Sequence, residues 1–120
     1  MTRTHLTISD PVGEALHDGR SVVALESTII THGMPYPQNL DVARAVEQEV
    51  RDAGAVPATI AILNGSLRIG LDPEQLTDLA QARDVAKVSR ADMAFVMAQG
   101  KSGATTVAAT SVPLWSRITT

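Results

Sequence analysis

One carboxylate is the first group in this sequence whose surroundings point to chemistry. Glu26 lies inside the apolar, β-branched run 22–30, and a turn-forming stretch with Pro35 and Pro37 follows it. Apolar surroundings disfavour the ionised form of a carboxyl, and a carboxyl that stays protonated near neutral pH can act as a general acid. The pattern also allows a plain structural role, in which Glu26 ends a strand and faces solvent or pairs with an arginine.

A cation is the second candidate group. Lys87 interrupts the short apolar stretch 85–88, directly before Ser89. Close to the N-terminus of a helix that Ser89 opens, this lysine could contact a phosphate. It could equally be an edge-strand lysine that discourages aggregation. The residue pattern supports both roles.

The segment 103–107 is the third candidate, because a glycine there precedes two threonines and Val107. Glycine permits close backbone approach, and backbone N–H groups at a helix start bind anions or oxygen-rich ligands. Ordinary helix capping would satisfy the same groups without a ligand. The segment matches neither a Walker loop nor a dinucleotide-binding glycine motif.

The other polar residues form no catalytic arrangement in the sequence. His32 stands beside a glycine, as turn and packing residues do, and His5 and His17 have no partner at metal-ligand spacing. Tyr36, between two prolines, fits a rigid loop wall. The absence of cysteine excludes disulfides, thiolate metal sites and a cysteine nucleophile.

Composition narrows the class of protein. The 120 residues are 44% hydrophobic and 19% charged, which is typical of a globular domain with an aliphatic core. A net charge of −3 and 2% aromatic residues offer no surface for nucleic acid. The N-terminus lacks the apolar run of a signal peptide, and no stretch approaches the roughly 20 apolar residues of a membrane span. We expect a cytoplasmic protein without nucleic-acid or membrane partners.

Strand patterns occur at four places. The apolar run 22–26 predicts a central strand that is covered on both faces. The run 56–63 predicts a second strand, and Asn64-Gly65 predicts a type I′ hairpin turn that returns the chain through 67–70. A short strand is predicted over 85–88.

Helix signals lie between these strands. Capping residues followed by apolar residues at helical spacing predict four helix starts, at Ser9, Asn39, Asp72 and Ser89. Gly19, Gly54 and Gly100 fit the helix ends. In the second helix Glu47 is expected on the outer face, and a fifth helix is expected over 107–109. The alternation predicts an α/β fold with a mixed sheet flanked by helices.

Four blocks of the sequence together resemble the pseudouridine-5′-phosphate glycosidases, also called the indigoidine synthase A-like family. They are ALESTIITHGMPYPQN at 24–39, GAVPATIA at 54–61, KVSR at 87–90 and GATTVAAT at 103–110. The resemblance extends from about Pro11 to Thr110 with the blocks in the family's order. Several long blocks are far more specific than any short motif.

The resemblance implies reversible cleavage of the C-glycosidic bond of pseudouridine 5′-phosphate, which gives uracil and ribose 5-phosphate. It implies that Glu26 is the proton donor. Lys87 matches a substrate-contacting position near the phosphate, and Val107 matches one that acts through its backbone. The family also uses a lysine nucleophile that binds the sugar as an imine-type adduct, a divalent metal that is typically Mn²⁺, and a homotrimeric assembly.

The sequence departs from the family after the fourth block. The family places its nucleophilic lysine and its metal-binding aspartate downstream of that block, where this chain has residues 111–120 with a helix-breaking Pro113. We therefore expect 1–110 to be the N-terminal portion of a larger glycosidase domain and 111–120 to be a divergent tail. On this basis Lys101 is not the nucleophile, and the ligand for Mn²⁺ is expected outside this chain.

Three functional hypotheses follow from the resemblance and the departure. The first is a pseudouridine-5′-phosphate glycosidase represented by its N-terminal portion. The second is an inactive truncated remnant that at most binds a phosphosugar. The third is a subunit whose site is completed by a separate chain. A truncated α/β sheet is also expected to expose an edge and apolar surface, which predicts marginal stability or aggregation.

Overall fold

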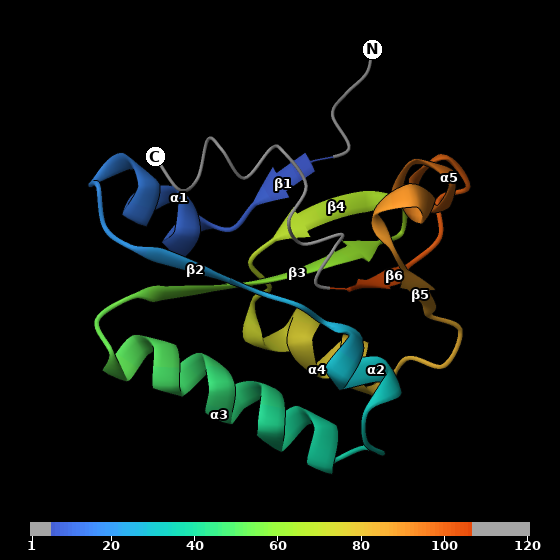
Figure 1. Cartoon of the computed structure of the whole chain (residues 1–120), viewed down its shortest axis with the longest axis horizontal. Helices are drawn as coiled ribbons and strands as arrows, with labels where there is room; N and C mark the ends of the chain where they lie inside the picture. Colours follow the sequence, from blue (N-terminus) through green and yellow to red (C-terminus); the bar gives the residue numbers. More distant parts are fainter. Residues whose placement is uncertain (1–5, 107–120) are drawn as a thin grey trace.

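Strands of both directions form one mixed sheet in the computed structural model of the chain, which describes residues 6–106 (Figure 1). The strands are β1 (Leu6–Ile8), β2 (Val22–Leu25), β3 (Val56–Leu63), β4 (Ser66–Ile69), β5 (Ala86–Val88) and β6 (Gly103–Thr105). Their order is β1-β4-β3-β6-β5, and β2 also pairs with β3. β3 is parallel to β2 but antiparallel to β4 and β6. The predicted mixed sheet is confirmed.

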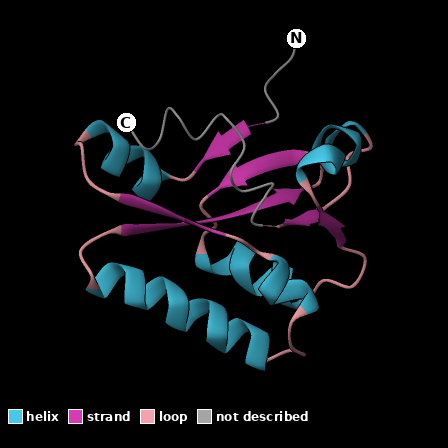
Figure 2. Cartoon of the chain, in the orientation of Figure 1, coloured by secondary structure: helices cyan, strands magenta, loops and turns pink. Residues whose placement is uncertain are grey.

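Helices cover both faces of this sheet (Figures 1 and 2). They are α1 (Asp10–His17), α2 (Thr28–His32), α3 (Gln38–Asp52), α4 (Pro73–Gln81) and α5 (Met93–Ala98), with a 3₁₀ turn at Arg90–Asp92 before α5. One face lies against α1 and α5, and the other lies against α2, α3 and α4. The expected α/β architecture is therefore built as three layers, in which the sheet is the middle one.

Side-chain alternation along β3 divides the core into two apolar clusters. Ile60 and Ile62 face α1 and α5, where Val12 and Val96 pack against them. Ala61 faces the opposite layer together with residues of α2, α3 and α4. Because successive strand residues point to opposite faces, the near-continuous apolar sequence of β3 supplies both clusters.

The local signals for the hairpin and for the capping box of α4 are confirmed, whereas Ser9 precedes α1 without making a side-chain capping hydrogen bond. Asn64 and Gly65 have φ values of 50° and 84°, as the type I′ turn between β3 and β4 requires. The N–H of Gln75 donates to Asp72 Oδ1 at 2.7 Å, and the N–H of Asp72 donates to Gln75 Oε1 at 3.0 Å, which completes the capping box of α4. None of the helices within residues 6–106 is both long enough and apolar enough to cross a membrane.

The prediction of a central strand over 22–26 is wrong in its burial. Within the described residues β2 ends at Leu25 and pairs only with β3, and Val23 remains 40% exposed. The apolar run continues into the short helix α2, which the sequence does not predict because apolar, β-branched residues are typical of a strand. The sequence does not predict β1, because three residues are too few to establish a period of two.

Two predictions about the second helix are also wrong. Asn39 is not its cap: α3 begins at Gln38, and Asn39 Nδ2 donates to the carbonyls of Ile30 at 2.7 Å and Ala80 at 2.8 Å. Glu47 is not on the outer face, since it is 7% exposed and accepts a 2.7 Å hydrogen bond from Thr59. A buried polar side chain with well-placed partners cannot be recognised from helical spacing alone.

The segment 103–105 is a strand and not the start of a helix. Gly103–Thr105 forms β6, which lies between β3 and β5. The glycine is needed for packing, because a Cβ at Gly103 would clash with the side chain of Val88. The predicted fifth helix over 107–109 and the predicted tail over 111–120 lie outside the described residues.

Candidate functional site

The carboxyl ends of β2 and β6 meet in the middle of the sheet, beside Ile60, and we call this place the strand junction. β2 runs parallel to β3 along 56–59, and β6 runs antiparallel to β3 along 61–62. This register brings the ends of the two strands together beside Ile60, and the N–H of Ser27 donates to the carbonyl of Thr105 at 3.1 Å. Open α/β sheets place ligands outside strand ends at such changes of direction.

Glu26 lies at this junction, directly after the last residue of β2. The side chain is half-buried, and its Oε1 accepts a hydrogen bond from Thr28 Oγ1 at 3.2 Å. The ion pairs of the described residues join Arg20 to Asp18 and Arg51 to Glu47, so no arginine there pairs with Glu26. A carboxyl that is partly sheltered, oriented by a hydroxyl and still reachable can exchange a proton with a ligand.

Lys87 lies near the same junction but is not joined to Glu26. β5 is parallel to β6, and Lys87 is paired in register with Ala104. The Lys87 side chain is exposed, and across residues 6–106 it makes no hydrogen bond or ion pair, with Glu26 or otherwise. Because Val88 packs into the cluster under α1 and α5, Lys87 points to the opposite face. The position of Lys87 on an edge strand fits the predicted role against aggregation. Its position beside the glycine–threonine segment fits the predicted contact with a phosphate.

The 103–107 segment reaches the junction through its described part. Thr105 is fully buried, and the N–H of Thr106 donates to the carbonyl of Val88 at 3.0 Å. This hydrogen bond holds the carboxyl ends of β5 and β6 side by side. Val107 itself lies outside the described residues, so its predicted role stays a prediction.

Histidine and tyrosine candidates take no part in a catalytic group among the described residues. His32 Nδ1 lies 2.6 Å from the Thr31 hydroxyl at the exposed end of α2. His17 and Tyr36 are exposed, as a surface helix end and a loop wall would be.

The 3₁₀ turn after Lys87 contains a carboxyl with a lowered pKa. The hydroxyl of Ser89 donates a hydrogen bond to Asp92 and is the larger cause of the lowered pKa, and the N–H of Ser89 also donates to Asp92.

Sequence reasoning misses Ser27, and it considers Thr105 only as part of the candidate segment 103–107 at a helix start. Both side chains are fully buried at the junction, and both hydroxyls donate to the carbonyl of Ile60, at 2.6 and 2.7 Å. In the sequence these residues look like ordinary capping residues. Only the register of β2 and β6 along β3 brings them together, and that register is a long-range property.

A metal site is not formed by residues 6–106, in which no group of three or more His, Cys, Asp or Glu side chains is placed to hold an ion. The Mn²⁺ that the family resemblance implies therefore finds no ligand set in this part of the chain.

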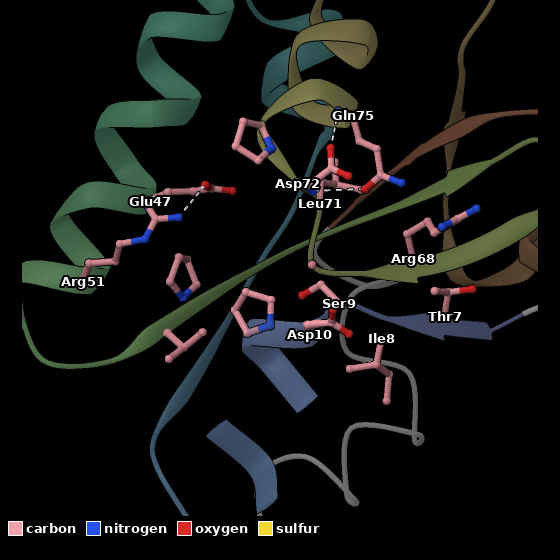
Figure 3. A pocket seen from close by; sticks show the side chains of 15 residues that line it. Thr7, Ile8, Ser9, Asp10, Glu47, Arg51, Arg68, Leu71, Asp72 and Gln75 are labelled. Atoms are coloured by element: carbon pink, nitrogen blue, oxygen red, sulfur yellow. Dashed lines mark hydrogen bonds and ion pairs between the residues drawn. The ribbon is translucent and has the colours of Figure 1, made fainter. Parts of the chain in front are cut away.

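A pocket of about 430 Å³ lies away from the strand junction (Figure 3). Its walls come from β1, α1, α3, the start of β3, β4 and the start of α4, and neither Glu26 nor Lys87 lines it. Arg68 on β4 borders this pocket, and its buried Nε has no hydrogen-bond partner among the described residues. The Glu47–Arg51 and Asp72–Gln75 contacts in the walls are structural. The strand junction, and not this pocket, carries the residues that the sequence singles out.

Comparison with known proteins gives relatives that are C-glycoside enzymes. The pseudouridine-5′-phosphate glycosidase of Jannaschia sp. (strain CCS1) is 66% identical over 107 residues, which cover 89% of this chain and 35% of that protein. The corresponding protein of Roseobacter denitrificans is 61% identical over 112 residues, covering 93% and 36%. The chain thus spans about a third of the length of these curated relatives.

Two solved structures are also similar to this chain. The prealnumycin C-glycosynthase AlnA, in complex with ribulose 5-phosphate, matches with a TM-score of 0.81 and 39% identity, over 98% of this chain and 37% of that one. An indigoidine synthase A-like protein from Thermotoga maritima matches with a TM-score of 0.77 and 29% identity, over 98% and 38%. The family model described as indigoidine synthase A like protein matches residues 11–114. The chain belongs to the indigoidine synthase A-like family.

Proposed function

We propose that this chain carries the proton-donor part of a pseudouridine-5′-phosphate glycosidase site. The observation that carries the proposal is Glu26, half-buried at the strand junction and hydrogen-bonded to Thr28, in a chain closely related to glycosidases of that name. The proposed reaction is reversible cleavage of pseudouridine 5′-phosphate to uracil and ribose 5-phosphate.

The chemistry of a C-glycoside explains why one acid at this place is useful. The bond to the base is a C–C bond, so there is no leaving-group oxygen to protonate, and the paired-carboxylate scheme of ordinary glycosidases does not apply. When the bond breaks, its electron pair goes to the carbon of the base, which must receive a proton, and the sugar carbon takes its new oxygen atom from water to give ribose 5-phosphate. Glu26 supplies that proton in the cleavage direction and takes it back in the reverse direction.

Two further positions are proposed to bind the substrate. Lys87 offers an exposed ammonium group on β5, at the edge of the sheet near the junction, and an ammonium group suits the 5′-phosphate. Val107 would contact the substrate through its backbone, just after the end of β6. The hydroxyl of Thr28 keeps the Glu26 carboxyl in one orientation while the substrate binds.

The test is uracil release from pseudouridine 5′-phosphate by the purified 120-residue chain, assayed with and without added Mn²⁺. We expect Glu26→Gln to lower the rate by about 10²–10⁴-fold, the usual contribution of general acid catalysis. Glu49→Gln is the matched control, because Glu49 is an exposed acid on α3. Equal rates for the Glu26→Gln variant and the parent chain would contradict the role of Glu26.

A second candidate function is phosphosugar binding without catalysis. It is favoured by the solved C-glycosynthase relative, whose structure contains ribulose 5-phosphate. Calorimetric titration with ribose 5-phosphate separates the two candidates. Binding without uracil release would favour the second candidate, and neither binding nor release would contradict both.

A further inference from the structure

The carbonyl of Ile60 faces a break in the pairing of β3. Residues 56–59 of β3 are paired with β2, and residues 61–62 are paired with β6, so Ile60 is opposite neither strand. The preceding carbonyl, of Thr59, accepts from Gly70 on the other side of the strand. Because neighbouring carbonyls of a strand point to opposite edges, the Ile60 carbonyl points into the break. A buried carbonyl at such a place needs a donor.

Two buried hydroxyls supply that donor and tie three strands together. Ser27 Oγ and Thr105 Oγ1 both donate to the Ile60 carbonyl, at 2.6 and 2.7 Å. The N–H of Thr105 donates in turn to Ser27 Oγ at 2.8 Å, and the N–H of Ser27 donates to the Thr105 carbonyl at 3.1 Å. These hydrogen bonds hold Ser27, two residues after β2, and Thr105, the last residue of β6, to each other and to β3.

The role of Ser27 differs from the one its position suggests. Ser27 precedes the first residue of α2, where a serine usually caps the helix by accepting a backbone N–H. Here it makes no capping hydrogen bond, because its hydroxyl is engaged with Ile60 and Thr105. The Ser27 hydroxyl therefore forms hydrogen bonds within the strand junction instead of capping α2.

We propose that Ser27 and Thr105 are positioning residues, whose hydroxyls fix Glu26 relative to Thr106, just after the end of β6. Glu26 directly precedes Ser27, and Thr106 directly follows Thr105, so a shift at the junction moves both sides of the proposed site. This inference rests on the proposed function for its catalytic meaning. A misplacement of about 1 Å can lower an enzymatic rate by about a hundredfold.

The test uses three substitutions at the junction and one matched control. Thr105→Val removes the hydroxyl but keeps the shape, whereas Thr105→Ser keeps the hydroxyl; Ser27→Ala removes the second hydroxyl. Thr59→Val is the control, because Thr59 is buried on β3 beside Ile60 but its hydroxyl donates a 2.7 Å hydrogen bond to Glu47 of α3 and none to Ser27, Ile60 or Thr105. Thermal midpoints of all variants are measured beside their kinetics.

We expect Thr105→Val and Ser27→Ala to lower kcat for uracil release by about tenfold to a hundredfold, with KM changed much less. Thr105→Ser is expected to stay within a few-fold of the parent chain. Thr59→Val is expected to lower the thermal midpoint while kcat is retained. Equal kcat losses in Thr105→Val and Thr105→Ser, or in Thr105→Val and Thr59→Val, would overturn the proposal.

Hydrogen exchange keeps this test separate from the test of the proposed function. In Thr105→Val and Ser27→Ala we expect faster exchange of the backbone amides in 25–29 and 103–106 than in β1 and β4, and no such local effect in Thr59→Val. If the parent chain releases no uracil, the proposed function fails, but the exchange rates still decide whether the hydroxyls hold the junction. Unchanged exchange in both segments would overturn the positioning role.

Discussion

At the scale of single residues, Lys87 has two roles open to it, and a phosphate ligand separates them. If the ammonium group contacts the phosphate, Lys87→Met should weaken binding of ribose 5-phosphate by about tenfold to a hundredfold, because a hydrogen bond to a charged group contributes about 1.5–3 kcal/mol. Calorimetry at two salt concentrations measures this, and the loss should shrink at high salt. Lys101→Met serves as the control, since Lys101 is exposed and follows α5.

The edge-strand role of Lys87 gives the opposite result. In that case Lys87→Met leaves the affinity for ribose 5-phosphate unchanged and increases aggregation of the chain, because a charge that blocks edge-to-edge pairing of β5 has been removed. Light scattering of the two lysine variants at equal concentration would detect it.

The candidate residues that the sequence can indicate are those with an unusual type for their surroundings. Glu26 and Lys87 stand out because each interrupts an apolar stretch, and both lie near the strand junction. Ser27 does not stand out, because small hydroxyl residues are common beside strands and helices, and Thr105 is noticed only as part of the segment 103–107, without its structural partners. The prediction for Glu47 fails for a related reason: a carboxylate is assigned to the surface unless its partner, here Thr59, is known.

At the scale of elements, the packing of β6 against β5 and α5 depends on Gly103. A Cβ there would clash with the side chain of Val88, which is fully buried and stiff at χ1, and would lie 3.4 Å from Val96 Cγ1. We expect Gly103→Ala to destabilise the chain by about 1–3 kcal/mol, the usual cost of overpacking, as measured by urea unfolding.

Gly13 provides the matched control for that substitution. It lies inside α1, and a Cβ added there would meet nothing within 4 Å. Gly13→Ala should therefore stabilise the chain by about 0.5–1 kcal/mol, since glycine inside a helix is less favourable than alanine. A loss of stability in Gly13→Ala equal to that in Gly103→Ala would show that the clash with Val88 is not the cause.

Elements whose signals are local can be predicted, and elements that depend on distant partners cannot. The hairpin at Asn64-Gly65 and the capping box at Asp72 each rest on a few adjacent residues, and both are confirmed. The sequence of β6 instead indicates a helix start, because its glycine and threonines satisfy capping preferences, whereas its strand conformation comes from pairing with β3 and β5. β1 likewise exists through its pairing with β4.

At the scale of the whole molecule, half of the large exposed apolar side chains of the described residues belong to the segment of sequence that carries Glu26. The described residues include eight large apolar side chains that are 37–65% exposed. Four of them fall between 23 and 36, namely Val23, Ile29, Met34 and Tyr36. Phe95 on α5 is the most exposed of the set. Grouped apolar exposure is a feature of interaction surfaces.

We therefore expect the chain to self-associate with rising concentration, through the apolar surface of the 23–36 segment. Sedimentation velocity over a range of concentrations measures the association. The double substitution Ile29→Ser and Tyr36→Ser should weaken it by about tenfold or more, because each removes an exposed apolar side chain from the contact. Phe95→Ser should have little effect, since α5 lies on the opposite face of the sheet from α2. Association that is abolished by Phe95→Ser and unaffected by the double substitution would assign the contact to the α5 face instead.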